Sequence, residues 1–175
     1  MSPLRGILFD VDGTLVDSTY FHTLTWWYAF RRFGHDVRMN EIHRRVGMGG
    51  QKIVEHLLGA ERDTAQDSEI LDTHAAVFST FWPHLRPFDG ARDLLARYED
   101  AGLSVVLASS AREQDLSVLR SVIDADAFVD AATSSADAEE PKPAPDILVV
   151  ALKATGLEAS EALFVGDAVW DVPHR

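Results

Sequence analysis

The chain of 175 residues has 28 acidic and 16 basic side chains, a formal net charge of −12, and no cysteine. This charge opposes the broad phosphate contact that nucleic-acid binders need, and the lack of cysteine excludes disulfides and thiolate metal sites. No run reaches the roughly 20 apolar residues of a membrane helix, and the first apolar run is too short for a signal peptide. We therefore expect a cytoplasmic protein that binds neither nucleic acid nor membrane.

The first predicted element is a short buried strand over Gly6–Phe9, whose residues are β-prone and bounded by a turn. Asp10 and Asp12 follow it directly, and Gly13 supplies the turn. A strand that ended only to reach solvent would need one polar residue, so two acids here point to a site.

Residues 18–82 show only helical spacing of apolar residues, with glycines at the joints. Helices are predicted over 18–34, 40–47, 49–59 and 66–82. Residues 82–90 contain two prolines and are predicted to return to the core along an extended path. An all-helical block after the first strand of an α/β domain indicates a lid or cap.

The rest of the chain alternates between helix and strand. A helix with Asp89 as N-cap and Gly102 after its end precedes a strand over Leu103–Ala108. A strand near 127–132, a helix over 145–156 and a strand over 162–166 follow. This predicts a Rossmann-like parallel sheet with helices on both faces, formed by residues 1–17 and 83–175, with residues 18–82 as the helical cap.

Polar residues follow the predicted strands at the sheet edge where ligands bind in open parallel sheets. Ser109 and Ser110 follow the second strand, and Asp167 follows the last one. Lys142 lies in the loop before the helix that leads to that last strand. With Asp10 and Asp12, the expected constellation is carboxylates, hydroxyls and one ammonium on one edge.

This set suits chemistry on a phosphate ester. Carboxylates alone would repel the phosphoryl dianion, and oxygen-only ligation favours Mg²⁺, held by Asp10, Asp167 and the backbone carbonyl of Asp12. One carboxylate could then attack phosphorus, and the other could exchange protons with the leaving alkoxide and water. Lys142 and the Ser109 hydroxyl would stabilise the equatorial oxygens.

The segments "DVDGTLVDS", "VVLASS", "EEPKPAPDIL" and "FVGDAVWD" resemble, in order and spacing, the four motifs of the haloacid dehalogenase superfamily. The nearest subgroup is the phosphoglycolate phosphatases and β-phosphoglucomutases, which carry a helical cap. The resemblance implies that Asp10 is the nucleophile and Asp12 the general acid and base. It also implies that Asp167 is a magnesium ligand and that Asp171 is a ligand or supports one.

The second acid of the first motif, Asp12, is usually lacking in the dehalogenases, so the resemblance implies phosphoryl chemistry. The expected function is a Mg²⁺-dependent phosphatase that hydrolyses a small phosphorylated metabolite through an aspartyl-phosphate. A sugar phosphomutase is the alternative, and His22, near a cap-hinge histidine of β-phosphoglucomutases, keeps it open. A catalytically impaired binding protein is the second alternative. We expect a monomer or homodimer.

The cap segment "RRVGMGGQKIVEHLL" contains three glycines with basic residues nearby. It is either a substrate-specificity loop that faces the site, in which Gly49 and Lys52 would contact substrate, or a glycine-rich joint between helices with solvated lysine and arginine. His22 and Ser110, outside this segment, are also expected to contact substrate.

The chain stops at Arg175, four residues after Asp171, whereas members of the family usually continue through another helix and strand. We therefore expect the carboxyl-terminal part of the core to be missing. The strand over 162–166 would then be an exposed edge, and Asp167 and Asp171 would be poorly held.

Overall fold

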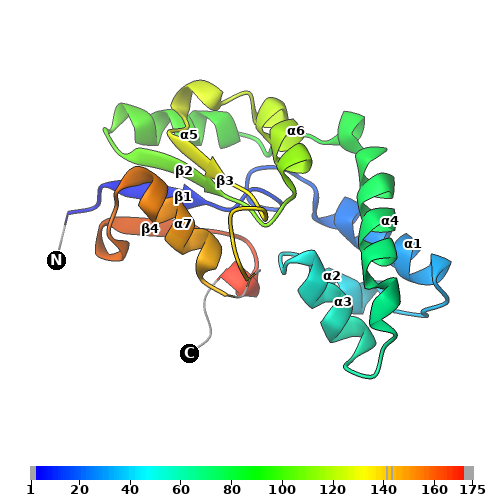
Figure 1. The fold of residues 1–175 in the computed structure, drawn as a ribbon. Helices are drawn as coiled ribbons and strands as arrows, with labels where there is room; N and C mark the ends of the chain where they lie inside the picture. Colours follow the sequence, from blue (N-terminus) through cyan, green and yellow to red (C-terminus); the bar gives the residue numbers. More distant parts are fainter. Residues whose placement is uncertain (1–2, 141, 143, 172–175) are drawn as a thin grey trace.

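The computed structural model describes residues 3–140, 142 and 144–171. Its centre is a four-stranded sheet of β1 (Gly6–Phe9), β2 (Ser104–Ala108), β3 (Ala131–Thr133) and β4 (Ala162–Val165), shown in Figure 1. The strand order is β3-β2-β1-β4, and every pair is parallel. The predicted Rossmann-like parallel sheet is confirmed.

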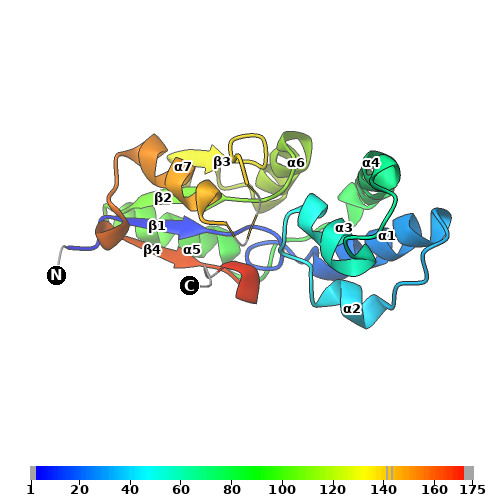
Figure 2. The same ribbon diagram turned by 60° about the horizontal axis from the view of Figure 1, so that its bottom comes forward.

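Helices cover both faces of this sheet. Because strand side chains alternate, Ile7 and Phe9 point into one core, which also holds Leu95 and Leu119. These belong to α5 (Ala91–Asp100) and α6 (Glu113–Ile123). Leu8 points the other way, into a cluster with residues of α7 (Asp146–Thr155), which lies on the opposite face in Figure 2. Because the strands are parallel, the polar residues that follow them lie at the same edge of the sheet, its carboxyl edge.

The block between β1 and β2 is helical, as predicted. It consists of α1 (Thr19–Arg32), α2 (Met39–His43), α3 (Gly50–Leu58) and α4 (Asp67–Ser79), with a 3₁₀ turn at Thr64–Gln66. These helices have a core of their own, which includes Trp26, Phe30, Ile42, Ile53 and Ile70. They form a lobe beside the carboxyl edge of the sheet (Figures 1 and 2). No helix in the described part of the chain is long and apolar enough to cross a membrane.

Three local predictions were wrong. Asp89 does not cap α5: the helix begins at Ala91, and its N-cap is Gly90 with a φ of 81°. The return segment begins with a 3₁₀ turn at Trp82–His84 rather than an extended path, because proline at the start of such a turn needs no N–H partner.

The third error concerns β3, which lies further along the chain than the predicted strand near 127–132. A 3₁₀ turn at Asp126–Phe128 occupies the start of that range. Two more 3₁₀ turns lie at Ala159–Glu161 and Val169–Asp171.

Two strand-like connections join the lobe to the sheet. Val16 forms an antiparallel bridge with Pro87, and the N–H groups of Asp17 and Phe88 donate to the carbonyl groups of Arg86 and Leu15 across the same pair.

The expectation that the carboxyl-terminal part of the core is missing rests partly on residues 172–175, which lie outside the described residues. Within the described chain, β4 pairs with β1 alone.

Candidate active site

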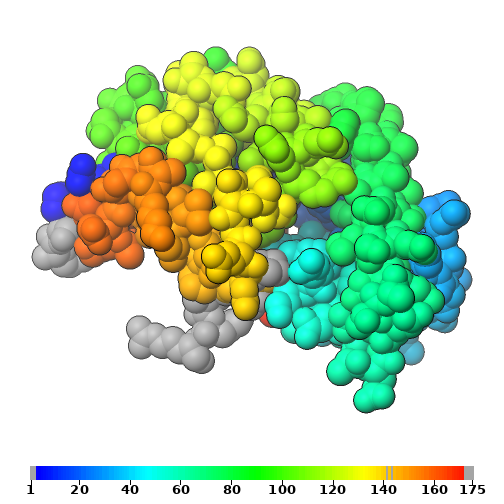
Figure 3. Space-filling view, in the orientation of Figure 1, coloured from blue at the N-terminus to red at the C-terminus, as the bar shows by residue number. Residues whose placement is uncertain are grey.

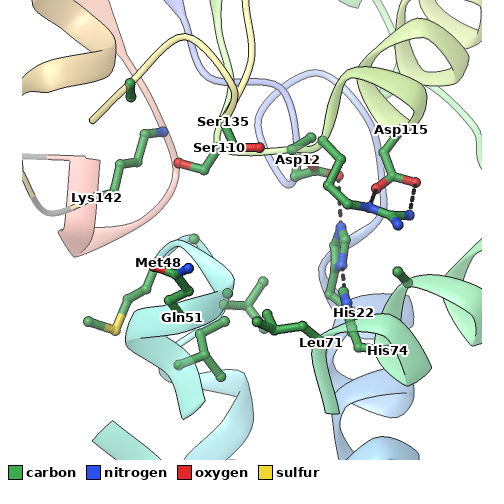
Figure 4. Close-up of a pocket in the computed structure, with 18 of the residues that line it drawn as sticks. Asp12, His22, Met48, Gln51, Leu71, His74, Ser110, Asp115, Ser135 and Lys142 are labelled. Carbon is green, nitrogen blue, oxygen red and sulfur yellow. Dashed lines mark hydrogen bonds and ion pairs between the residues drawn. The ribbon is translucent and has the colours of Figure 1, made fainter. Parts of the chain in front are cut away.

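A cavity of about 420 Å³ lies between the carboxyl edge of the sheet and the helical lobe. The loops after the strands form its sheet side, and α1, α3, α4 and the 46–48 segment form the other, as Figure 4 shows for the labelled residues. The predicted residues that line it are Asp10, Asp12, His22, Ser110 and Lys142. Residues from four separate segments therefore meet at one place.

Lys142 lies between two carboxylates. Its Nζ donates to Asp10 Oδ1 at 2.6 Å and to Asp171 Oδ1 at 2.7 Å. All three side chains are buried, with Lys142 only 3% exposed. The second oxygen of Asp171 accepts from the N–H of Ala168 at 2.9 Å, which fixes this carboxylate in the turn after β4. Asp171 thereby positions the ammonium beside Asp10.

One ammonium for two buried carboxylates leaves an excess negative charge. Burial raises the pKa of Asp10 to about 7; Lys142 acts against this, and the charges of Asp171 and Asp12 add to it. Burial acts to lower the pKa of Lys142, but the two carboxylates outweigh it and raise that pKa. Lys142 therefore stays charged near neutral pH, whereas Asp10 titrates there.

The remaining oxygens of this cluster suit a hard cation. Asp10, Asp167 and Asp171 each offer a carboxylate oxygen within 4.8 Å of the others. Thr14 Oγ1 donates to Asp10 Oδ2 at 3.3 Å and to Asp167 Oδ1 at 3.4 Å, so these two acids face the same point. Gly13 has a φ of 82°, and a Cβ there would collide with Asp167. An all-oxygen set with excess negative charge fits Mg²⁺.

Asp12 lines the same cavity, but it has different partners. Its Oδ1 accepts from Ser18 Oγ at 2.6 Å and lies 3.1 Å from His22 Nε2. His22 Nδ1 in turn lies 3.3 Å from His74 Nε2, so the His22 ring lies between Asp12 and His74 in Figure 4. Burial acts to raise the pKa of Asp12, but His22 and Ser18 outweigh it and lower that pKa. The side chain of Asp12 is outside the carboxylate cluster around Asp10.

The two serines after β2 have different surroundings. Ser109 is buried, and its Oγ accepts from the N–H of Ala111 at 3.0 Å. Its O–H has no acceptor among the described residues. Ser110 lines the cavity directly. Helix α6 begins only at Glu113, so Ser109 orders the loop before the helix.

The structure does not bring Gly49 and Lys52 to the cavity wall. Gly49 is the buried N-cap residue of α3, and Lys52 pairs with Glu55 at 3.3 Å on the partly exposed side of that helix. Their neighbours Met48 and Gln51 line the cavity instead. The glycine-rich segment faces the site, but with other side chains than those predicted.

The glycine-rich segment also packs on the turn that carries the last motif. A Cβ on Gly47 would lie 2.7 Å from the Cβ of Ala168, and Trp170 Nε1 donates to the carbonyl of Arg44 at 3.0 Å. The Trp170 ring packs against the core of the helical lobe. The turn that holds Asp167 and Asp171 is thus fastened to the lobe.

Residues that the sequence argument missed also line the cavity. His74 comes from α4 and Arg112 from the loop before α6. Thr14, which links Asp10 to Asp167, belongs to the first motif and could have been found there. His74 lies 52 residues from His22, at no spacing that marks a pair.

Comparison with known proteins shows the family to which the chain belongs. A family model described as a haloacid dehalogenase-like hydrolase matches residues 4–173. Protein CbbY (plasmid) of Cupriavidus necator is 27% identical over 94% of this chain and 71% of its own length. A phosphoglycolate phosphatase of Pseudomonas savastanoi pv. phaseolicola is 26% identical over 95% of this chain and 63% of its own.

Among solved structures, a hydrolase from Pseudomonas syringae superposes with a TM-score of 0.90, at 28% identity, over 97% of this chain and 78% of that one. The chain thus spans less than two thirds of the length of the phosphoglycolate phosphatase and more than two thirds of CbbY and of the Pseudomonas syringae hydrolase. With nearly all of its length matched by the family model, the chain belongs to the haloacid dehalogenase-like hydrolase family.

Proposed function

We propose that the chain is a Mg²⁺-dependent phosphatase that hydrolyses a small phosphorylated metabolite through a phosphoaspartate at Asp10. The observation that carries this proposal is the buried Lys142 ammonium, held between Asp10 and Asp171 in the wall of the cavity. A buried cation beside a carboxylate at the cavity wall suits a reaction that gathers negative charge on a phosphoryl group. The relatives named as phosphatases support the same class of reaction.

In the proposed reaction, a carboxylate oxygen of Asp10 attacks phosphorus and forms an acyl phosphate while the ester P–O bond breaks. Asp12 in its protonated form gives a proton to the leaving alkoxide, and the resulting Asp12 carboxylate takes a proton from the water that hydrolyses the acyl phosphate. Lys142 stabilises phosphoryl oxygens throughout. Asp10 and Asp167 would hold Mg²⁺, which neutralises the charge of the phosphoryl group when bound.

The proposal is tested by measuring phosphate release from p-nitrophenyl phosphate and from a panel of metabolite phosphomonoesters. Turnover should require magnesium and should be lost after chelation of divalent ions, because the acids around Asp10 would then repel the phosphoryl group. Turnover that survives chelation would contradict the metal requirement. No turnover on any ester would favour the binding protein.

The pH dependence should show the raised pKa of Asp10. A protonated carboxyl is a poor nucleophile, so at limiting magnesium kcat/KM should fall as the pH drops below about 7. Saturating magnesium should move this acidic limb to lower pH, because a bound dication favours the carboxylate. Phosphate release measured across pH at both magnesium levels checks this. An acidic limb near 4, the ordinary carboxylate value, at limiting magnesium would contradict it.

A sugar phosphomutase is the second candidate, and the contact of His22 with Asp12 favours it. His22 belongs to the helical lobe and contacts Asp12, the acid that transfers protons. Proton transfer could therefore depend on closure of the lobe over a sugar hydroxyl. Product analysis with a hexose 1-phosphate separates the two candidates. A mutase gives the isomeric hexose phosphate with little free phosphate, and a phosphatase gives free phosphate.

A further inference from the structure

The charged side chains around the cavity are unequally paired. Carboxylates predominate on its wall. Among the described lining residues there are one lysine and one arginine. The lining carboxylates are those of Asp10, Asp12, Asp72, Asp115, Glu139 and Glu140, and the cations are Lys142 and Arg112. The partners of each cation decide what else the cavity can bind.

Both cations are already held by carboxylates. Lys142 is shared between Asp10 and Asp171. Arg112 donates from Nε to Asp115 Oδ2 at 2.8 Å and from Nη2 to Asp115 Oδ1 at 3.1 Å. Asp115 is 5% exposed, and Trp82 Nε1 also donates to it at 3.2 Å. This bidentate pair fixes the guanidinium and largely cancels its charge.

The two histidines of the cavity wall also have partners. His22 Nε2 lies 3.1 Å from Asp12 Oδ1. Burial, with the nearby charges of His22 and Arg112, lowers the pKa of His74 well below its usual value, so this ring is neutral near pH 7. No lysine, arginine or histidine on the described wall is thus left without a partner to receive a second anion.

Three acids on the wall have no cationic partner among the described residues. Glu139 and Glu140 lie in the loop after β3, and Asp72 lies on α4 in the helical lobe. The N–H of Glu140 donates to Asp146 Oδ2 at 3.0 Å, which ties this loop to the start of α7. Figure 3 shows the loop (yellow) facing the lobe (cyan and green) across the opening. Negative charge therefore flanks the cavity from both sides.

The other lining groups are neutral. Gln51, Ser110 and Ser135 offer an amide and two hydroxyls, and Trp26, Met48 and Leu71 are apolar. Such a wall can hydrogen-bond hydroxyl or ammonium groups and can contact carbon atoms. It provides no counter-charge for a carboxylate or a second phosphate that leaves water to enter.

Building on the proposed phosphatase function, we propose that the site selects phosphate monoesters whose leaving group is neutral or positively charged and discriminates against those that carry a second anionic group. The phosphoryl group itself is accommodated by Lys142 and the cluster around Asp10. A second anion would face Glu139, Glu140 and Asp72 without compensation, and such repulsion is an effective source of specificity.

Three esters of nearly equal size test this proposal: 2-aminoethyl phosphate, 2-hydroxyethyl phosphate and phosphoglycolate. They differ at one end, which is an ammonium, a hydroxyl or a carboxylate. We expect kcat/KM for the first two to exceed that for phosphoglycolate by about tenfold or more, equivalent to about 1.4 kcal/mol. A kcat/KM for phosphoglycolate equal to or above that for 2-hydroxyethyl phosphate would overturn the proposal.

Charge variants locate the effect. The triple variant Asp72→Asn, Glu139→Gln and Glu140→Gln should reduce the ratio of 2-aminoethyl phosphate to phosphoglycolate kcat/KM several-fold. The matched control is Asp93→Asn, Glu99→Gln and Asp100→Asn, three exposed acids of α5 that do not line the cavity. It also lowers the negative charge of the protein but should leave the ratio unchanged. Equal shifts in both variants would show a general charge effect and would overturn the assignment to the cavity.

Binding separates this proposal from the phosphatase proposal. The affinities of the three esters for the Asp10→Asn chain with magnesium, measured by calorimetry, need no turnover. The same order of affinities supports the charge selection even if the wild-type chain hydrolyses none of the esters. Hydrolysis with phosphoglycolate bound most tightly would leave the phosphatase in place and overturn the selection.

Discussion

Replacing Asp10 by asparagine should lower kcat for every phosphomonoester by at least about 10⁴-fold. The amide keeps the size of the side chain and an oxygen for Lys142, but it cannot attack phosphorus. Asp10 is 6% exposed and borders the cavity. Phosphate release at saturating substrate and magnesium measures the loss.

The control for this variant is Asp17→Asn, which changes an exposed acid of the same sequence motif. It should keep wild-type turnover. Matching thermal unfolding of the two variants would show that the loss is not one of folding. An Asp10→Asn protein that hydrolyses esters at more than about a hundredth of the wild-type rate would contradict the nucleophile assignment.

Replacing Lys142 by methionine should lower both activity and stability. Asp10 and Asp171 would remain buried without a counter-charge, and breaking a buried ion pair in this way costs about 3–5 kcal/mol. The loss of a cation from the phosphoryl site should lower kcat by a further factor of about 10² to 10³. Denaturant unfolding and phosphate release measure the two effects.

The loss of stability in the Lys142→Met variant should depend on pH. Without Lys142, the pKa of Asp10 should rise further above its unfolded value, because no cation then offsets its burial and the repulsion by Asp171. The folded state then binds more protons than the unfolded chain, so the loss of stability should be largest at high pH and should shrink as the pH falls. Lys153→Met, an exposed lysine of α7, is the matched control. Equal losses in both variants would contradict the account.

The sheet and the residues at its edge were predictable because each depends on local pattern. The four-residue apolar run before Asp10 forms β1 with the predicted bounds. Once the strands are parallel, the residues directly after them must share one edge, which places Asp10 and Asp167 together. The order and spacing of the motifs along the chain indicated the role of each residue.

The lobe side of the cavity was less predictable because it depends on the rotational phase of short helices. Gln51 and Lys52 are adjacent, and successive residues of a helix point about 100° apart, so one lines the cavity while the other pairs with Glu55. No sequence signal fixes that phase across a glycine joint. The contact of His22 with His74 depends on the packing of α1 on α4 and was missed for the same reason.

The most direct test of the account is to find where the phosphoryl group is held during turnover. The wild-type chain would be quenched with acid during steady-state hydrolysis of p-nitrophenyl phosphate with magnesium, digested and examined by mass spectrometry for a phosphorylated carboxylate. The account predicts phosphate on Asp10, with none on Asp12 and none in the Asp10→Asn chain. Phosphate on Asp12, or rapid turnover by the Asp10→Asn chain without a phosphorylated carboxylate, would contradict it.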